Sequence, residues 1–95
     1  MLKLIKTNHN GIECLKDKNN LFMVVKENNG YRLLKAKQNN PEWVNNCKCW
    51  SYEEMYNYTF KTQKEVLKEI RLELEMGHWD EFQDQLVNEY LLDIQ

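Results

Sequence analysis

The fold is decided by the stretch LFMVVKENNGYRLLKAK, residues 21–37. Two runs rich in β-favouring residues flank the central Asn-Asn-Gly. Asn-Gly between two such runs is the strongest short-range indication of a β-hairpin. We therefore expect strands over residues 21–26 and 31–37, joined by a tight turn at residues 28–30.

Further Asn-rich turns lie on both sides of this hairpin, since asparagine tolerates left-handed backbone. Upstream, residues 2–6 and 12–16 are predicted as two shorter strands around the turn NHNG at residues 8–11. Downstream, NNP at residues 39–41 interrupts the chain.

The segment that follows, residues 43–60, gives two conflicting indications. Aromatic residues recur at alternate positions, which favours a strand. However, SYEE at residues 51–54 resembles a capping box, which would begin a short helix. We predict a strand over residues 56–60 and leave residues 51–55 open between helix and strand.

Two amphipathic helices are predicted in the last third of the chain. TQKE at residues 62–65 is a capping box at the start of the first helix, and Gly77 is placed to end it in left-handed backbone. Asp80 can then cap the second helix. The apolar stripes of the two helices are formed by Val66, Leu67, Ile70 and Leu74, and by Trp79, Phe82, Leu86, Val87, Tyr90, Leu91 and Ile94.

These elements make one domain over residues 1–95, mainly β over residues 1–60 and an αα-hairpin over residues 62–94. Strands followed by helices predict an α+β fold: a small antiparallel sheet of four to five strands with two amphipathic α-helices packed on one face. The sequence shows neither a signal peptide nor an apolar run long enough to span a membrane. We therefore expect a cytoplasmic protein.

The cysteines and histidines form no recognisable motif. Three cysteines, an odd number, argue against a disulfide framework and indicate reduced thiols. Cys47 and Cys49 could bind a metal with Cys14, His9 or His78, but zinc sites usually contain two ligand pairs. We interpret the cysteines as small, half-buried strand residues. We predict no metal and no cofactor. We also predict no catalytic site, because no flanking motif supports His9 or His78 and so short a chain leaves little room for a pocket.

Charge divides the chain into halves of opposite sign. Residues 1–50 carry nine basic and four acidic side chains, or +5, and residues 51–95 carry four and eleven, or −7, which gives the net −2. Taken alone, the acids indicate solubility; the functional interpretation is a surface that docks on a basic protein. The acids that we expect to bind such a partner are Glu69, Glu73, Glu81, Asp84 and Glu89.

Two apolar residues of the first helix, Leu72 and Met76, lie one turn apart and off the main stripe. We expect them to seal the contact with the second helix. The alternative is an exposed anchor for a partner.

A second hypothesis concerns the aromatic segment. Trp50, Tyr52 and Tyr56 could stack unpaired bases while Lys35 and Lys37 contact phosphates. A small domain needs its aromatic residues in the core, however, and a nucleic-acid binder should present a net basic face. We therefore favour the core for these rings, and the lead interpretation includes no direct contact with nucleic acid.

In its size, its lack of motifs and its acidic helical end from Glu65 to Asp93, the chain resembles small phage and mobile-element proteins of the anti-CRISPR (anti-defence) type. The resemblance implies a stoichiometric inhibitor that occludes a nucleic-acid channel of a host nuclease complex or blocks a conformational step. The lead hypothesis is a non-enzymatic protein-binding module, whose partner is a basic host protein or protein–nucleic-acid complex. The alternatives are a single-stranded nucleic-acid-binding domain and a structural homo-oligomer subunit, for which a homodimer would suffice.

Overall fold

In the computed structural model, strands precede helices along the chain. The structure describes residues 2–38 and 42–94. At residues 42–44, 47 and 48 it describes the backbone alone. The elements are β1 (Leu4–His9), β2 (Ile12–Asp17), β3 (Phe22–Glu27), β4 (Gly30–Ala36), β5 (Glu42–Val44), β6 (Cys47–Cys49), β7 (Tyr52–Glu54), α1 (Gln63–Met76) and α2 (Glu81–Ile94). The predicted α+β order is confirmed.

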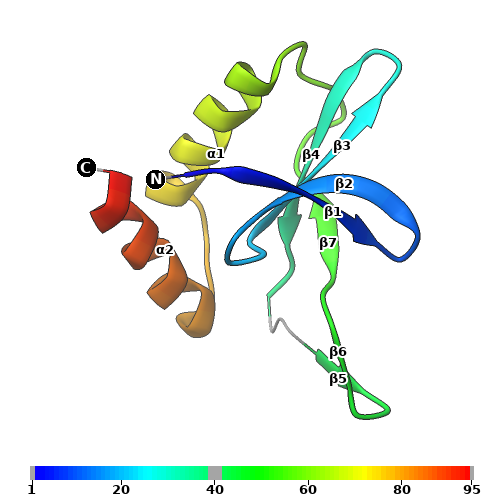
Figure 1. Ribbon diagram of the computed structural model, residues 1–95. Helices are drawn as coiled ribbons and strands as arrows, with labels where there is room; N and C mark the ends of the chain where they lie inside the picture. Colours follow the sequence, from blue (N-terminus) through cyan, green and yellow to red (C-terminus); the bar gives the residue numbers. More distant parts are fainter. Residues whose placement is uncertain (1, 39–41, 95) are drawn as a thin grey trace.

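The main sheet is antiparallel, with five strands in the order β1-β2-β3-β4-β7. Both helices lie on one side of it, and β5 and β6 form a separate hairpin that projects from its lower end (Figure 1). Because alternate residues of a strand face opposite sides, one sheet face packs on the helices and the other faces away from them.

The predicted central hairpin is confirmed: β3 and β4 pair along their whole length, from Phe22↔Lys35 to Glu27↔Gly30. Gly30 has φ 138°, and a Cβ atom there would collide with the carbonyl oxygen of Phe60. The chain at Phe60 lies this close because Tyr31 and Phe60 exchange two backbone hydrogen bonds, of 2.7 and 2.8 Å. Glycine therefore allows the aromatic segment to cross the hairpin at its turn.

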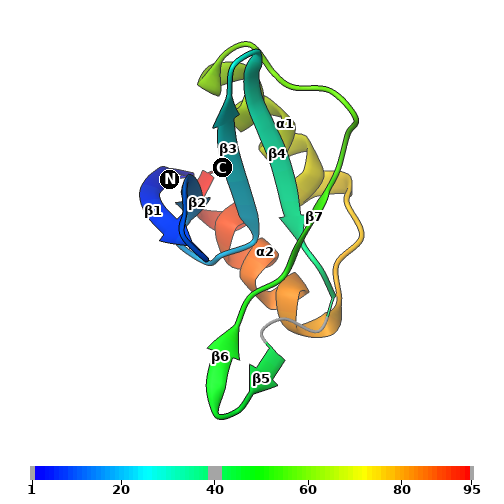
Figure 2. The ribbon, with the colours of Figure 1, turned by 90° about the vertical axis from the view of Figure 1, so that its right-hand side faces the viewer.

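The N-terminal hairpin is also confirmed, with Asn10 and Gly11 in left-handed backbone between β1 and β2. In the described part of the chain, β2 pairs with β3 at two positions, Leu15↔Val24 and Lys16↔Met23. Beyond these positions the two hairpins diverge, and the β1–β2 hairpin stands apart from β3 and β4 (Figure 2).

The strand predicted over residues 56–60 is wrong. Instead, residues 52–54 form strand β7. They lie in the segment 51–55, which the sequence left open between helix and strand. Tyr56, Tyr58 and Phe60 instead pack on one another, with Tyr56 and Tyr58 stacked at 5.1 Å between ring centroids. Their alternating spacing therefore arises from a cluster of rings and not from a pleated strand.

The N-cap predictions hold for both helices. The Thr62 hydroxyl accepts a hydrogen bond from the Glu65 N–H at 3.2 Å, and the Asp80 carboxylate accepts one from the Gln83 N–H at 2.8 Å. Gly77 ends α1, but in extended backbone (φ −77°), so the predicted left-handed conformation is wrong. Glycine is needed there because a Cβ atom would meet the Glu73 carbonyl oxygen at 2.5 Å.

The core lies between the helices and the facing side of the sheet. Its buried members come from both layers: Leu21, Phe22, Val24, Leu33, Val66, Ile70, Leu74, Val87 and Tyr90. Burial of these large side chains is the main favourable term in the stability of so small a domain.

Three apolar residues of the helices are exposed, contrary to prediction. Leu72 and Met76 do not seal the helix pair: they are 40% and 74% exposed. Phe82 is 51% exposed, and its neighbour Gln83 is buried in its place, where the side-chain amide donates to the carbonyl oxygen of Lys37 at 2.8 Å. In the described chain, no helix is long and apolar enough to cross a membrane.

Candidate functional site

The two acids of α1 proposed to bind a partner are engaged inside the protein. The Tyr56 hydroxyl donates to Glu69 Oε1 at 2.6 Å, which together with burial raises the pKa of Tyr56. Glu73 Oε1 accepts from the Lys35 ammonium at 2.6 Å, in an ion pair whose two side chains are largely buried. Glu69 and Glu73 therefore hold α1 against β4 and the aromatic segment, so both predicted binding residues already have partners within the fold.

The acids of α2 are different. Glu81, Asp84 and Glu89 are exposed, and no hydrogen bond or ion pair joins their side chains to another described residue. Two large apolar side chains lie among them, Phe82 at 51% and Leu92 at 77% exposed. We call these five residues the α2 outer face. Because α2 contains no Lys or Arg, nothing in the helix neutralises this face.

The residues of the nucleic-acid hypothesis are divided between the two sheet faces. Tyr52 pairs with Ala36 and Glu53 pairs with Lys35, so Tyr52 and Lys35 point to opposite sides. Lys35 faces the helices, where its ammonium also donates to the His78 carbonyl oxygen at 2.8 Å and lies 4.2 Å from the Trp79 ring centroid. Lys35 is therefore committed within the fold and is not placed to contact a phosphate.

The remaining members of that set give no common stacking surface. Tyr52 donates its hydroxyl proton to the Asn20 carbonyl oxygen at 3.0 Å, and Lys16 lies over its ring. Tyr56 lies on the helix side with Glu69. Trp50 is half-buried and Lys37 is exposed, and both make contacts within the protein. These aromatic rings are half-buried and lie on two sides of the sheet. The preferred interpretation, which places them in the core, therefore holds in part.

A cluster of titratable groups lies on the sheet face away from the helices. The Lys16 ammonium is 3.0 Å from His9 Nδ1, and the His9 ring contacts the edge of Tyr52 at 5.2 Å between centroids. Burial lowers the pKa of Lys16 and of His9, and it raises the pKa of the Cys14 thiol. A buried thiol with a raised pKa is not an activated nucleophile, so the cluster gives no support for thiol chemistry.

The cysteines do not form the predicted half-buried pair. Cys49 is exposed, Cys14 is buried, and the side chain of Cys47 lies outside the described residues. Among the side chains that are described, no three His, Cys, Asp or Glu gather as metal ligands.

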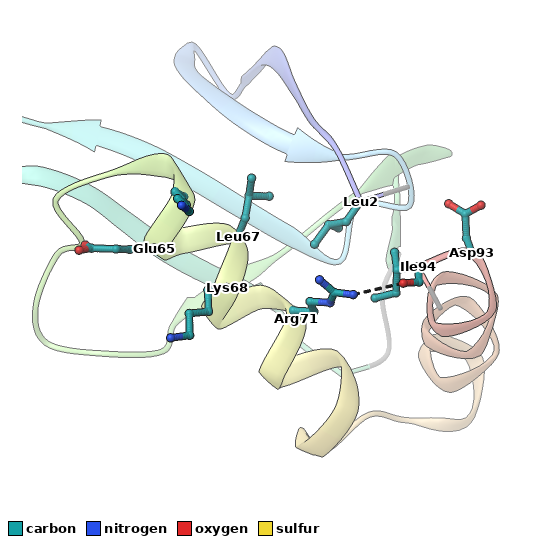
Figure 3. A pocket seen from close by; sticks show the side chains of 8 residues that line it. Leu2, Glu65, Leu67, Lys68, Arg71, Asp93 and Ile94 are labelled. Carbon is teal, nitrogen blue, oxygen red and sulfur yellow. Dashed lines mark hydrogen bonds between the residues drawn. The ribbon is translucent and has the colours of Figure 1, made fainter.

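A groove missed by the sequence interpretation opens between α1, the end of α2 and the residues before β1 (Figure 3). It is open to solvent, and its volume is about 740 Å³. Leu2, Leu67 and Ile94 supply its apolar lining, and the Arg71 guanidinium donates to the Ile94 carbonyl oxygen at 3.2 Å. The other lining residues are Lys64, Glu65, Lys68 and Asp93.

Comparison of the chain with protein families, with curated proteins and with solved structures finds no match. The geometry alone therefore identifies the candidate sites, which are the α2 outer face and the groove.

Proposed function

We propose that the protein is a non-enzymatic protein-binding module that docks the α2 outer face on a basic protein. The observation that carries this proposal is the presence of exposed Phe82 and Leu92 among acids that have no described partner. Apolar anchors supply most of the free energy of binding at protein interfaces, and surrounding charges supply orientation and a fast, salt-dependent association.

The more specific form of the proposal is an inhibitor of the anti-CRISPR (anti-defence) type. A basic channel that normally holds nucleic acid is complementary in charge to Glu81, Asp84 and Glu89, and a protein seated there would exclude the nucleic acid. This form places the protein in the cytoplasm, beside a host nuclease complex. Because Glu69 and Glu73 are engaged in the fold, α2 alone supplies the acids.

The test is a tagged pull-down from bacterial lysate with and without nuclease, with bound species identified by mass spectrometry. We expect a protein that is retained after nuclease treatment and released by salt. The affinity of that purified protein is then measured for two variants of equal net charge. Glu81→Lys/Glu89→Lys should lose binding, whereas the matched control Glu53→Lys/Glu75→Lys changes exposed acids elsewhere and should retain it.

Equal affinity for both double variants would remove the α2 outer face as the docking surface. Recovery of nucleic acid, with proteins lost on nuclease treatment, would instead favour the nucleic-acid hypothesis. That hypothesis has less structural support, because its residues lie on two faces of the sheet.

A further inference from the structure

The groove between the helices has cations that the fold leaves available. Lys64 and Lys68 are exposed, and within residues 2–38 and 42–94 neither ammonium has a described partner. Arg71 uses one N–H group on the Ile94 carbonyl oxygen, so other donors of its guanidinium remain. The Glu65 carboxylate at the rim is already committed to the Lys61 N–H at 3.0 Å. The groove is thus apolar, with a border of three cations and Glu65 along α1 and with Asp93 on the α2 side.

The length of this border indicates the kind of ligand that would fit. Lys64 and Arg71 are seven residues apart on α1, about 10 Å at 1.5 Å per residue. A ligand with a single carboxylate reaches one end of such a border. An amphipathic helix with several acids beside an apolar side chain matches its whole length, in the helix-in-groove mode of recognition.

The chain itself contains a helix with these properties. On the α2 outer face, Glu89 lies three residues before the exposed Leu92. On α1, Lys64 lies three residues before Leu67, and Arg71 lies four residues after it. If Leu92 of a second copy covers Leu67, Glu89 comes beside Lys64 when the helices run parallel and beside Arg71 when they run antiparallel. Either direction pairs opposite charges.

We propose that the protein self-associates by laying the α2 outer face of one copy into the groove of another. Contact with Leu67 and Ile94 removes from water the most exposed large apolar side chain of the described chain, Leu92. Acids that have no described partner within one copy meet the ammonium groups of Lys64 and Lys68, which also lack one, or the remaining donors of Arg71. Each copy presents one groove and one α2, so two copies can satisfy each other reciprocally.

This inference does not rest on the proposed function, but the two are linked. The same α2 outer face would be buried between copies and would also dock on a basic partner. Self-association and partner binding are therefore mutually exclusive. The partner binds the monomer and shifts the equilibrium between monomer and dimer toward the monomer.

The experiment measures the molar mass of the purified full chain by sedimentation equilibrium over a wide range of concentration, in low and in high salt. The mass should rise from the monomer value of 11.6 kDa toward twice that value as concentration rises. High salt should weaken the association, because exposed ion pairs are screened. A constant monomer mass at all concentrations in low salt would overturn the inference, and a monomer that still binds a basic partner would leave the proposed function standing.

Complementary variants test the contact itself. Lys64→Glu/Lys68→Glu alters the groove and Glu81→Lys/Glu89→Lys alters the α2 outer face; each alone should remain monomeric. An equimolar mixture should associate again, because the intact α2 of the first variant fits the intact groove of the second. Glu53→Lys/Glu75→Lys is the matched control and should associate like the parent protein. All four residues changed in the test variants are exposed, and circular dichroism checks that each variant is folded. A mixture that stays monomeric, or a control that also dissociates, contradicts the proposed contact.

Discussion

The Tyr90 hydroxyl on α2 donates a hydrogen bond of 2.8 Å to Oδ2 of Asp17 at the end of β2. Asp17 is 2% exposed, and its Oδ1 accepts from the Phe22 N–H at 2.6 Å while Oδ2 also accepts from the Asn19 N–H at 3.1 Å. Burial raises the pKa of Asp17, and these bonds partly offset that effect. One carboxylate therefore joins the N-terminal hairpin, the start of β3 and the last helix.

Replacing this carboxylate should strongly destabilise the protein. Asp17→Ala leaves the buried Phe22 N–H and the Tyr90 hydroxyl without an acceptor. We expect a loss of about 3–5 kcal/mol in the free energy of unfolding, since each unsatisfied buried group costs about 1–3 kcal/mol. Urea unfolding followed by circular dichroism measures it. Tyr90→Phe is the matched control, which removes one donor and should cost about 1 kcal/mol. A smaller loss for Asp17→Ala than for Tyr90→Phe would contradict this role.

The Lys35–Glu73 ion pair should show strong coupling in a double-mutant cycle. Either Lys35→Met or Glu73→Met alone leaves a largely buried charge without its partner, and we expect each to cost about 2–3 kcal/mol of stability. The double variant should be little worse than either single one, because apolar side chains of similar size replace both charges. Thermal or urea unfolding of the four proteins gives the coupling free energy. Strictly additive losses would show that the pair does not act as a unit.

Acid should destabilise the protein through His9. The groups that face its ring are Lys16, Tyr52 and Asn10, and its pKa is lowered by burial and then by the Lys16 charge. The unfolded chain therefore binds a proton more readily. The stability that neutral His9 contributes is present above the ordinary histidine pKa of about 6.5 and is lost as the pH falls through the lower pKa of the folded state.

The measurement is the melting temperature of the parent protein and of His9→Gln from about pH 7.5 to pH 5, a range that spans the ordinary histidine pKa. The parent should lose more stability than the variant on acidification. The pKa of Asp17 is raised, so Asp17 has the opposite effect and favours the folded state as the pH falls. Both proteins contain Asp17, so its effect cancels in the comparison. Parallel curves would show that His9 does not titrate with folding.

Gly30 should tolerate substitution worse than Gly11. Gly11→Ala meets no neighbouring atom and costs the left-handed conformation alone, about 1–2 kcal/mol. Gly30→Ala adds a collision with the Phe60 carbonyl and must displace the crossing segment, so its cost should exceed that of Gly11→Ala. Urea unfolding compares the two variants, and tyrosine fluorescence reports on the aromatic cluster. Equal losses would show that the crossing at Phe60 can move freely.

Local chemistry made the hairpins and helices predictable. Asn-Gly turns, the Thr62 cap and the Asp80 cap each act within a few residues, so their patterns are written contiguously in the chain. β7 was not predictable in this way, because Tyr52–Glu54 becomes a strand through pairing with β4. The β5–β6 hairpin separates these two strands in the sequence. Spacing alone could not tell the ring cluster of residues 56–60 from a strand.

The candidate site was less predictable, because distant partners decide which charges are free. Glu69 and Glu89 look alike in the sequence, but Tyr56 holds Glu69 while Glu89 stays exposed. The groove is assembled from Leu2, Leu67 and Ile94, which lie in three separate parts of the chain. In the same way, the sequence around Asp17 is polar and typical of an exposed turn, but Tyr90 covers Asp17 in the structure. Glu81, Asp84 and Glu89 could be proposed from the sequence, because no hydrogen bond or ion pair joins their side chains to another described residue.

The narrow connection between the two hairpins bears on how the protein opens. β2 and β3 pair at two positions, whereas β1–β2 and β3–β4 each pair at six. Each hairpin can therefore exchange its amide protons as a separate cooperative unit, the outer one more rapidly than the inner one, which the helices cover. The backbone amides of β1 and β2 would lose protection first, with β3, β4 and α1 forming the slowest-exchanging part of the molecule.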